Sequence, residues 1–276
     1  MSEVRVDTAR APRTQRAQIL VGTSGYSFPD WPGRFYPEGM KSGDFLEFYA
    51  RHFPAVEVNS TYYRIPPPRT LERMAAKTPP EFRFVVKLHG SMTHEHSLGA
   101  DAVASFRAML EPLKQTGKFD GLLAQFPYGF HRTPANRLHL AAVRDAFADE
   151  PLFVEFRHDS WLAPEVVPAL RERRIGWCAV DEPALPHLLP PVTHLTSEDA
   201  YVRFHGRNAA TWYGGGGERY DWDYQVSELT DWVKKIGELA DQARRVYLFF
   251  NNCHAGQAAR SAKLMQELLR QEGLTV

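Results

Sequence analysis

Residues 152–180 read LFVEFRHDSWLAPEVVPALRERRIGWCAV, which predicts a strand, a helix and a second strand in one continuous stretch. The apolar runs at 152–156 and 175–180 are short and rich in β-branched and aromatic residues, a composition that favours strands. Pro164 suits the first turn of the helix between them, because the N–H that proline lacks has no helical partner at that position. Strands separated by a helix in this way pair in parallel within one sheet.

The same alternation runs along most of the chain. Apolar runs predict eight strands, at residues 19–22, 55–59, 82–88, 121–126, 152–156, 175–180, 200–205 and 246–251. Helical spacing of apolar residues predicts helices at 44–53, 69–77, 101–114, 134–148, 164–173, 224–242 and 256–270. Eight strands alternating with helices in 276 residues predict an α/β fold, a single (β/α)₈ TIM barrel rather than an open doubly wound sheet.

The sixth connection departs from this pattern. Residues 181–199 contain four prolines and show no long helical pattern, and proline cannot continue a helix because it lacks the backbone N–H. We therefore expect an irregular sixth crossover with at most one short helix.

A glycine-rich loop follows the seventh strand, with the sequence WYGGGGERY at 212–220. Four consecutive glycines predict a mobile segment, and three interpretations stay open: a lid over the barrel mouth, a phosphate-binding nest, or an ordinary surface loop. The loop is not a P-loop, because no Gly-Lys-Ser/Thr follows the glycines.

Composition and charge bound the class of protein. Lys plus Arg and Asp plus Glu balance at 33 each, which argues against a protein built mainly to coat nucleic acid or an anionic membrane. No apolar run reaches about 18 residues, so no membrane partner is expected. Cys178 and Cys253 are predicted to be thiols in a reducing compartment, and we expect a cytoplasmic protein. Residues 1–18 are predicted to be a disordered N-terminal tail, with 19–276 as the barrel domain; the oligomeric state stays open.

Side-chain alternation predicts which residues share the barrel interior, here called the lumen. Alternate residues of a barrel strand face the helices and the lumen, and we expect the apolar set to face the helices. The other set then gathers ionisable groups of five strands in the lumen: Glu57, Lys87, Glu155, Arg157, Asp181, Arg203 and His205. Most of them lie late in their strands, at the end where barrel enzymes build active sites. Acids and bases together in a cleft are typical of a catalytic site, and a structural network of ion pairs is the alternative.

Six motifs in order resemble one known family. They are GTSGY at 22–26 followed by Trp31 and GRFYP at 33–37, EVNSTYYR at 57–64, Thr93-His94, EFRH at 155–158 with Trp161, RFHGR at 203–207, and FFNN at 249–252. Together they resemble the YecE-like family, domain of unknown function seventy-two, over about residues 19–269. The resemblance implies a TIM barrel, in agreement with the strand count, and implies no particular reaction. Ser261 departs from the family pattern, which has asparagine at this position.

Glu57 and Glu155 are the first candidates for acid and base catalysis. A carboxylate beside cations stays ionised and acts as a base, whereas one in an apolar pocket becomes an acid, and the sequence does not assign these two roles. His158 and His205 are further candidates for proton transfer. Asp181, expected in the same lumen, completes the predicted catalytic set.

Cationic, aromatic and amide residues are predicted to bind a substrate. Lys87, Arg157, Arg203 and Arg207 favour an anionic ligand such as a sugar phosphate or a phosphodiester, unless they serve to neutralise the nearby acids. Aromatic rings in the loops after the strands are suited to stack on a sugar or a base, and amides grip hydroxyl or phosphate oxygens. The remaining predicted binding residues are Tyr26, Asn59, Tyr62, His94, Gln125, Trp161, Asn251 and Asn252.

No metal ligand is assigned from the sequence. Histidines and acids near a barrel rim bind Zn²⁺ or Mn²⁺ in many proteins, and His94-Glu95-His96 is such a group. Its spacing matches no strong metal signature, so the cofactor stays open, with a divalent metal as an alternative.

The sequence thus favours an enzyme of the isomerase or hydrolase class. It would act at the C-terminal mouth of the barrel on an anionic ligand that contains a sugar or a phosphate. One alternative is a non-catalytic protein that binds nucleic acid or a phosphorylated ligand. Another is a metal-dependent phosphodiesterase resembling barrel endonucleases, which rests on fold analogy alone.

Overall fold

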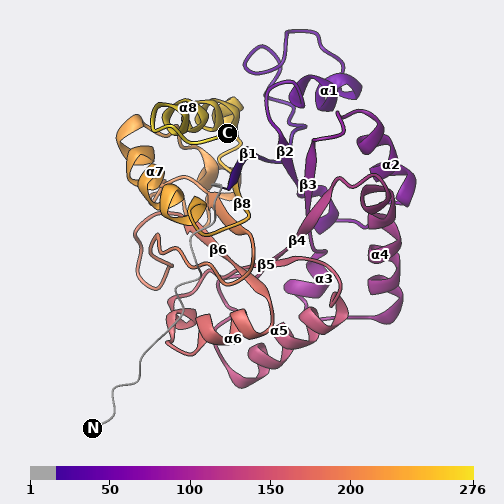
Figure 1. Cartoon of the computed structure of the whole chain (residues 1–276), viewed down its shortest axis with the longest axis vertical. Helices are drawn as coiled ribbons and strands as arrows, with labels where there is room; N and C mark the ends of the chain where they lie inside the picture. Colours follow the sequence, from indigo (N-terminus) through magenta and orange to yellow (C-terminus); the bar gives the residue numbers. More distant parts are fainter. Residues whose placement is uncertain (1–16) are drawn as a thin grey trace.

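A computed structural model describes residues 17–276, whose strands form one closed parallel barrel (Figure 1). Each strand pairs with its neighbours in chain order, and β8 closes the barrel against β1. The strands are β1 (Gln18–Ser24), β2 (Ala55–Val58), β3 (Arg83–Lys87), β4 (Phe119–Gln125), β5 (Leu152–Glu155), β6 (Ile175–Asp181), β7 (Ala200–Phe204) and β8 (Arg245–Phe250). The predicted eight-stranded TIM barrel is confirmed.

Helices surround this barrel on its outside (Figure 1). They are α1 (Phe45–Tyr49), α2 (Pro68–Ala76), α3 (Gly90–Thr93), α4 (Ala100–Gln115), α5 (Pro134–Ala146), α6 (Val166–Glu172), α7 (Val226–Ala240) and α8 (Gln257–Gln271). All of the predicted helices are present, most of them shorter than predicted. The short helix α3 was not predicted, because four residues are too few to show a helical pattern; the His89 side chain caps it by accepting from Ser91 N–H.

The two irregular segments lie where they were predicted. Residues 182–199, between β6 and β7, contain turns and no helix. The glycine-rich loop after β7 contains one 3₁₀ turn, η4 (Gly216–Tyr220), where Asn208 and Thr211 donate to the carbonyl of Glu218. Its predicted mobility stays a prediction.

The barrel begins slightly earlier than the predicted domain boundary. Ala17 is buried and its N–H donates to Ala240 O, and Gln18 already belongs to β1. The rest of the predicted tail, residues 1–16, lies outside the described residues. Within 17–276, no helix combines the length and the apolar character that crossing a bilayer requires.

Aromatic rings fill the lumen beneath the ionisable residues. Phe153 packs against Tyr201 with ring centroids 4.7 Å apart, and Tyr201 packs against Phe249 at 5.4 Å. All three side chains are almost fully buried. Phe153 and Tyr201 come two residues before Glu155 and Arg203 on the same strands, so these two ionisable residues lie nearer to the carboxyl ends of β5 and β7.

Candidate functional site

Arg203 of β7 lies at the centre of the lumen and joins two buried carboxylates. Its Nη2 donates to Glu57 Oε1 at 2.7 Å, and its Nη1 donates to Glu155 Oε2 at 2.6 Å. Both glutamates are 0% exposed and Arg203 is 1% exposed. Charges so deeply buried are tolerated only because the opposite charges and hydrogen bonds replace the lost water. One guanidinium therefore ties together strands β2, β5 and β7.

Arg157, just after β5, extends this network toward the mouth. Its Nε donates to Glu155 Oε1, and its Nη1 donates to Glu182 Oε2 at 2.9 Å. Burial alone would raise the pKa of Glu155, but Arg157 and Arg203 hold that pKa well below its ordinary value. Burial dominates at Glu182 and raises its pKa to about 7, although Arg157 opposes the shift. At neutral pH Glu155 is thus fully ionised, whereas Glu182 is near its midpoint.

The predicted acid and base candidates Glu57 and Glu155 are fully engaged by protein donors. The second oxygen of Glu57 accepts from the Tyr201 hydroxyl at 2.6 Å. Both oxygens of each glutamate thus accept hydrogen bonds, and neither side chain reaches solvent. Their geometry suits neutralising and orienting Arg203 and Arg157 better than contacting a ligand directly.

His205 is buried between the same groups and stays neutral. Burial and the neighbouring Arg157 lower its pKa to about 3. Asn251 Nδ2 lies 3.1 Å from His205 Nδ1, and Glu155 Oε1 lies 3.3 Å from Nε2. Arg157 Nη2 lies 3.0 Å from the same Nε2, so a proton on Nε2 suits Glu155 whereas a lone pair on Nε2 suits Arg157. His205 is therefore suited to orient Glu155 and Asn251.

Lys87, the last residue of β3, differs from the other lumen cations. Its Nζ donates to Gln125 Oε1 at 2.7 Å and lies 4.5 Å from the centre of the Tyr62 ring. Among residues 17–276, no carboxylate forms an ion pair with this ammonium. Burial, followed by the positive charge of Arg203, lowers the pKa of Lys87 to about 7. At neutral pH a substantial fraction of Lys87 is an uncharged amine.

A cavity of about 430 Å³ opens above Lys87 at the carboxyl ends of the strands. This size suits a small ligand. Eight of the twelve predicted binding residues line it: Tyr26, Asn59, Tyr62, Lys87, Gln125, Arg157, Arg203 and Asn251. Ser24, Tyr63, Tyr220 and Cys253 also line the cavity and were not predicted. The Oδ1 atom of Asn59 is buried without a hydrogen-bond partner, which leaves one acceptor in the cavity wall unsatisfied.

The predicted position of Asp181 in the lumen is wrong. Asp181 faces helix α7, where it accepts from Trp232 Nε1 and from the Tyr224 hydroxyl, both at 2.6 Å. Arg207 pairs with the same carboxylate at 2.6 Å. The cause is that β6, with the sequence IGWCAVD, is apolar on both sides up to its last residue, so polarity along the strand does not mark which side chains face inward.

The opposite set of β6 side chains faces the lumen. Cys178 Sγ lies 3.8 Å from Glu155 Oε2, and alternation from Cys178 leads to Glu182, which the prediction missed. Glu182 also accepts from Leu189 N–H, so it anchors the irregular crossover to the mouth. Assigning every second residue from Cys178 to the lumen would have identified Glu182.

Four predicted binding residues do not line the cavity. Trp161 stacks on Phe156 at 4.0 Å and its Nε1 donates to Phe130 O, so it packs a loop against the barrel. Arg207 pairs with Asp181, as described above. His94 packs against Tyr62 at 4.9 Å behind the cavity wall, and burial, followed by Lys87, lowers its pKa to about 4.

Asn252, the fourth of them, points away from the cavity toward α8. Its Nδ2 donates to Trp222 O at 2.8 Å and to Ser261 Oγ at 3.1 Å. Ser261, the departure from the family pattern, thus keeps a polar contact at this position. The remaining catalytic candidate, His158, lies at the rim, where it caps the 3₁₀ helix η3 (Asp159–Leu162).

A larger hollow of about 950 Å³ lies at the opposite end of the barrel, beside the amino ends of β5 and β7. Most of its arginine side chains form ion pairs or hydrogen bonds with other residues of the protein. Arg244 pairs with Asp199 at 2.5 Å, and Arg144 donates to the carbonyl of Glu150 at 2.9 Å. The converging acids and bases lie in the mouth cavity instead, which is therefore the candidate site.

Sequence comparisons place the chain among proteins without an assigned activity. A family model described as "Protein of unknown function DUF72" matches residues 20–276. The UPF0759 protein YunF of Bacillus subtilis (strain 168) is 33% identical over 270 residues, covering 91% of this chain and 94% of that protein. The UPF0759 protein YecE of Escherichia coli (strain K12) is 35% identical over 97 residues, about a third of each chain.

Solved structures agree with the sequence comparisons. A DUF72 family protein from Thermotoga maritima MSB8 superimposes with a TM-score of 0.85 and 40% identity, covering 92% of this chain and 99% of that chain. Another, from Enterococcus faecalis V583, gives a TM-score of 0.82 and 29% identity over 92% and 96% of the two chains. The family model covers nearly the whole chain, and the barrel matches as well. This protein therefore belongs to the DUF72 family.

Proposed function

We propose that this protein is an enzyme that acts at the carboxyl-terminal mouth of its barrel on a small anionic ligand containing a sugar or a phosphate. One observation carries the proposal: in a lumen whose other cations are paired with carboxylates, Lys87 alone among the described residues has no such partner and lines the cavity. A desolvated ammonium without a counter-ion favours the binding of an anion.

Lys87 is also the group best suited to react with the ligand. A lysine near other cations and shielded from water loses its proton near neutral pH, which makes it an effective base or nucleophile. Its pKa of about 7 has this origin. Gln125, which accepts from Nζ, orients the amine. We assign Lys87 as the residue that takes up and returns a proton.

The other lumen residues support this group. Glu57 and Glu155 keep Arg203 in place, and Arg203 in turn helps to lower the pKa of Lys87. Tyr26 and Tyr62, on the cavity wall, offer faces for the apolar side of a sugar ring. Reversible proton transfer by a single amine suits an isomerase, and activation of water by the same amine suits a hydrolase.

Replacing Lys87 by Met tests the proposal. The wild type is screened against aldose phosphates, ketose phosphates and a chromogenic phosphodiester, following isomerisation and phosphate release. Because general acid and base catalysis contributes about 10²–10⁴-fold, we expect Lys87→Met to lower kcat by at least about 100-fold. The control is Lys234→Met, which removes an exposed lysine of α7.

The screen also distinguishes the alternatives. Turnover of a substrate at the wild-type rate by Lys87→Met would contradict the role of this residue. Binding of the same ligands without turnover by the wild type would favour a non-catalytic binding protein. Affinity for an oligonucleotide that falls steeply with salt would favour nucleic acid as the ligand.

A further inference from the structure

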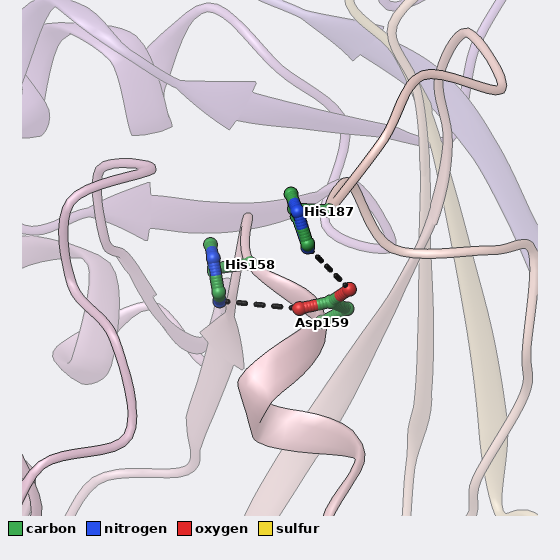
Figure 2. Close-up of side chains that lie close together, drawn as sticks. All are labelled: His158, Asp159 and His187. Atoms are coloured by element: carbon green, nitrogen blue, oxygen red, sulfur yellow. Dashed lines mark hydrogen bonds and ion pairs between the residues drawn. The ribbon is translucent and has the colours of Figure 1, made fainter.

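A second group of potential ligands lies at the rim of the barrel, outside the cavity. His158 and Asp159 begin the loop after β5, and His187 comes from the irregular crossover between β6 and β7 (Figure 2). One potential ligand atom of each lies within 4.8 Å of the others. Among residues 17–276, this is the one group of three histidine, cysteine or acidic side chains that converges so closely.

The distances fit a small transition-metal ion. Metal–ligand bonds of about 2.0–2.1 Å to histidine nitrogen and carboxylate oxygen place neighbouring ligand atoms of a tetrahedral site about 3.3–3.4 Å apart. His158 Nδ1 lies 3.4 Å from Asp159 Oδ1, and His187 Nδ1 lies 3.1 Å from Asp159 Oδ2. These two contacts use different oxygens of Asp159, so the carboxylate has to turn until one oxygen faces both rings before two edges of a three-ligand site are formed. The third closes by a small movement of His187, whose side chain is 65% exposed.

The hydrogen bond that His158 accepts leaves no proton between its Nδ1 and Asp159. Ser160 N–H donates to His158 Nδ1 at 3.1 Å, so this nitrogen carries a lone pair rather than a proton. The Asp159 carboxylate has no hydrogen to donate to it. The 3.4 Å contact between them thus joins two acceptors. A cation between them would make the contact favourable, and Nδ1 would then release the Ser160 N–H bond, because this nitrogen has one lone pair.

His187 adopts an unfavourable backbone conformation beside His158 and Asp159. His187 has φ of +65°, in the left-handed region that residues other than glycine seldom occupy. Asp159 N–H donates to His187 O at 3.0 Å, which joins the two loops. The His131 ring stacks on His158 at 3.9 Å and fixes that ring from its other side. Strained residues of this kind occur preferentially at binding sites.

We propose that His158, Asp159 and His187 bind one divalent transition-metal ion at the rim of the barrel mouth. Two imidazoles and a carboxylate suit Zn²⁺ and its neighbours, and they discriminate against Mg²⁺ and Ca²⁺, which prefer oxygen ligands. Three protein ligands leave one tetrahedral position for water or for an anionic group. This inference does not depend on the role proposed for Lys87.

Zinc titration of the full chain, prepared without a histidine tag and treated with a chelator, tests the site. Isothermal calorimetry is expected to show one equivalent of Zn²⁺ bound to the wild type. His187→Gly and Asp159→Asn are each expected to weaken binding by more than about tenfold, because even outer-shell partners of metal sites contribute roughly 10–100-fold. His187→Gly also relieves the left-handed strain, so it is not expected to lower the melting temperature.

The chain offers a matched control. His254 lies 3.9 Å from Asp221 on the surface, and residues 17–276 place no third ligand beside them, so His254→Gln removes a similar histidine and should leave zinc binding unchanged. Cobalt is a second probe, since its visible d–d absorption reports inner-sphere ligands. We expect that absorption in the wild type and its loss in His187→Gly. Absence of saturable zinc binding by the wild type, or wild-type affinity in both variants, would overturn the proposal.

Discussion

Replacing Arg203 by Met is expected to lower the free energy of unfolding by about 3–5 kcal/mol, because it leaves the buried Glu57 carboxylate without a cation and removes one of the two cations of Glu155. Glu57 would keep only the Tyr201 hydroxyl as a donor, and Glu155 would keep Arg157. Met fills a similar volume, so lost packing contributes little. In a chain of this size the change corresponds to a fall in melting temperature of roughly 6–20 °C, measured by calorimetry or circular dichroism.

A triple variant separates charge from shape. In Arg203→Met with Glu57→Gln and Glu155→Gln, the two carboxylates are removed together with the cation. The unpaired charges then disappear, and the melting temperature should recover a large part of the loss, although the amides satisfy fewer of the hydrogen bonds. A triple variant no more stable than Arg203→Met would show that packing, rather than charge pairing, accounts for the destabilisation.

The sequence predicted the barrel well because its strands alternate in polarity. In β2, β3, β5 and β7 one set of side chains is apolar and the other carries ionisable groups, so Glu57, Lys87, Glu155 and Arg203 were assigned correctly to the lumen. In β6 both sets are apolar apart from Asp181. The Asp181 side chain contacts α7 instead of the lumen. Without a polarity difference, alternation does not show which face of the strand points to the lumen.

The sequence did not establish which charged side chains form ion pairs in the lumen, because the pairs depend on which strands lie opposite each other. Arg203 and Glu155 are 48 residues apart, and Arg203 and Glu57 are 146 apart. The sequence identified four cationic residues near the mouth but did not show which of them lacks a carboxylate partner. The histidine group at the rim was equally hidden: His187 lies in a proline-rich segment without periodicity, next to His158 only in the folded chain.

Lys87→Met is expected to be more stable than the wild type at pH 6, with the difference shrinking as the pH rises. In the wild type the folded pKa of Lys87 is about 7, whereas the same side chain in an unfolded chain has a pKa of about 10.4. Below pH 7 the amine is protonated in both states, and the folded state carries the full cost of a desolvated ammonium near Arg203.

Between about pH 7 and 10.4 the unfolded chain holds this proton while the folded chain has released it, so the stability of the wild type rises relative to that of Lys87→Met. Melting temperatures of both proteins from pH 6 to pH 9.5 measure this convergence. The exposed Lys234→Met variant removes the same charge without burial and should run parallel to the wild type. If the melting temperatures of Lys87→Met and the wild type change with pH in parallel, Lys87 keeps an ordinary pKa. That result would contradict the proposal that its amine is the reacting group.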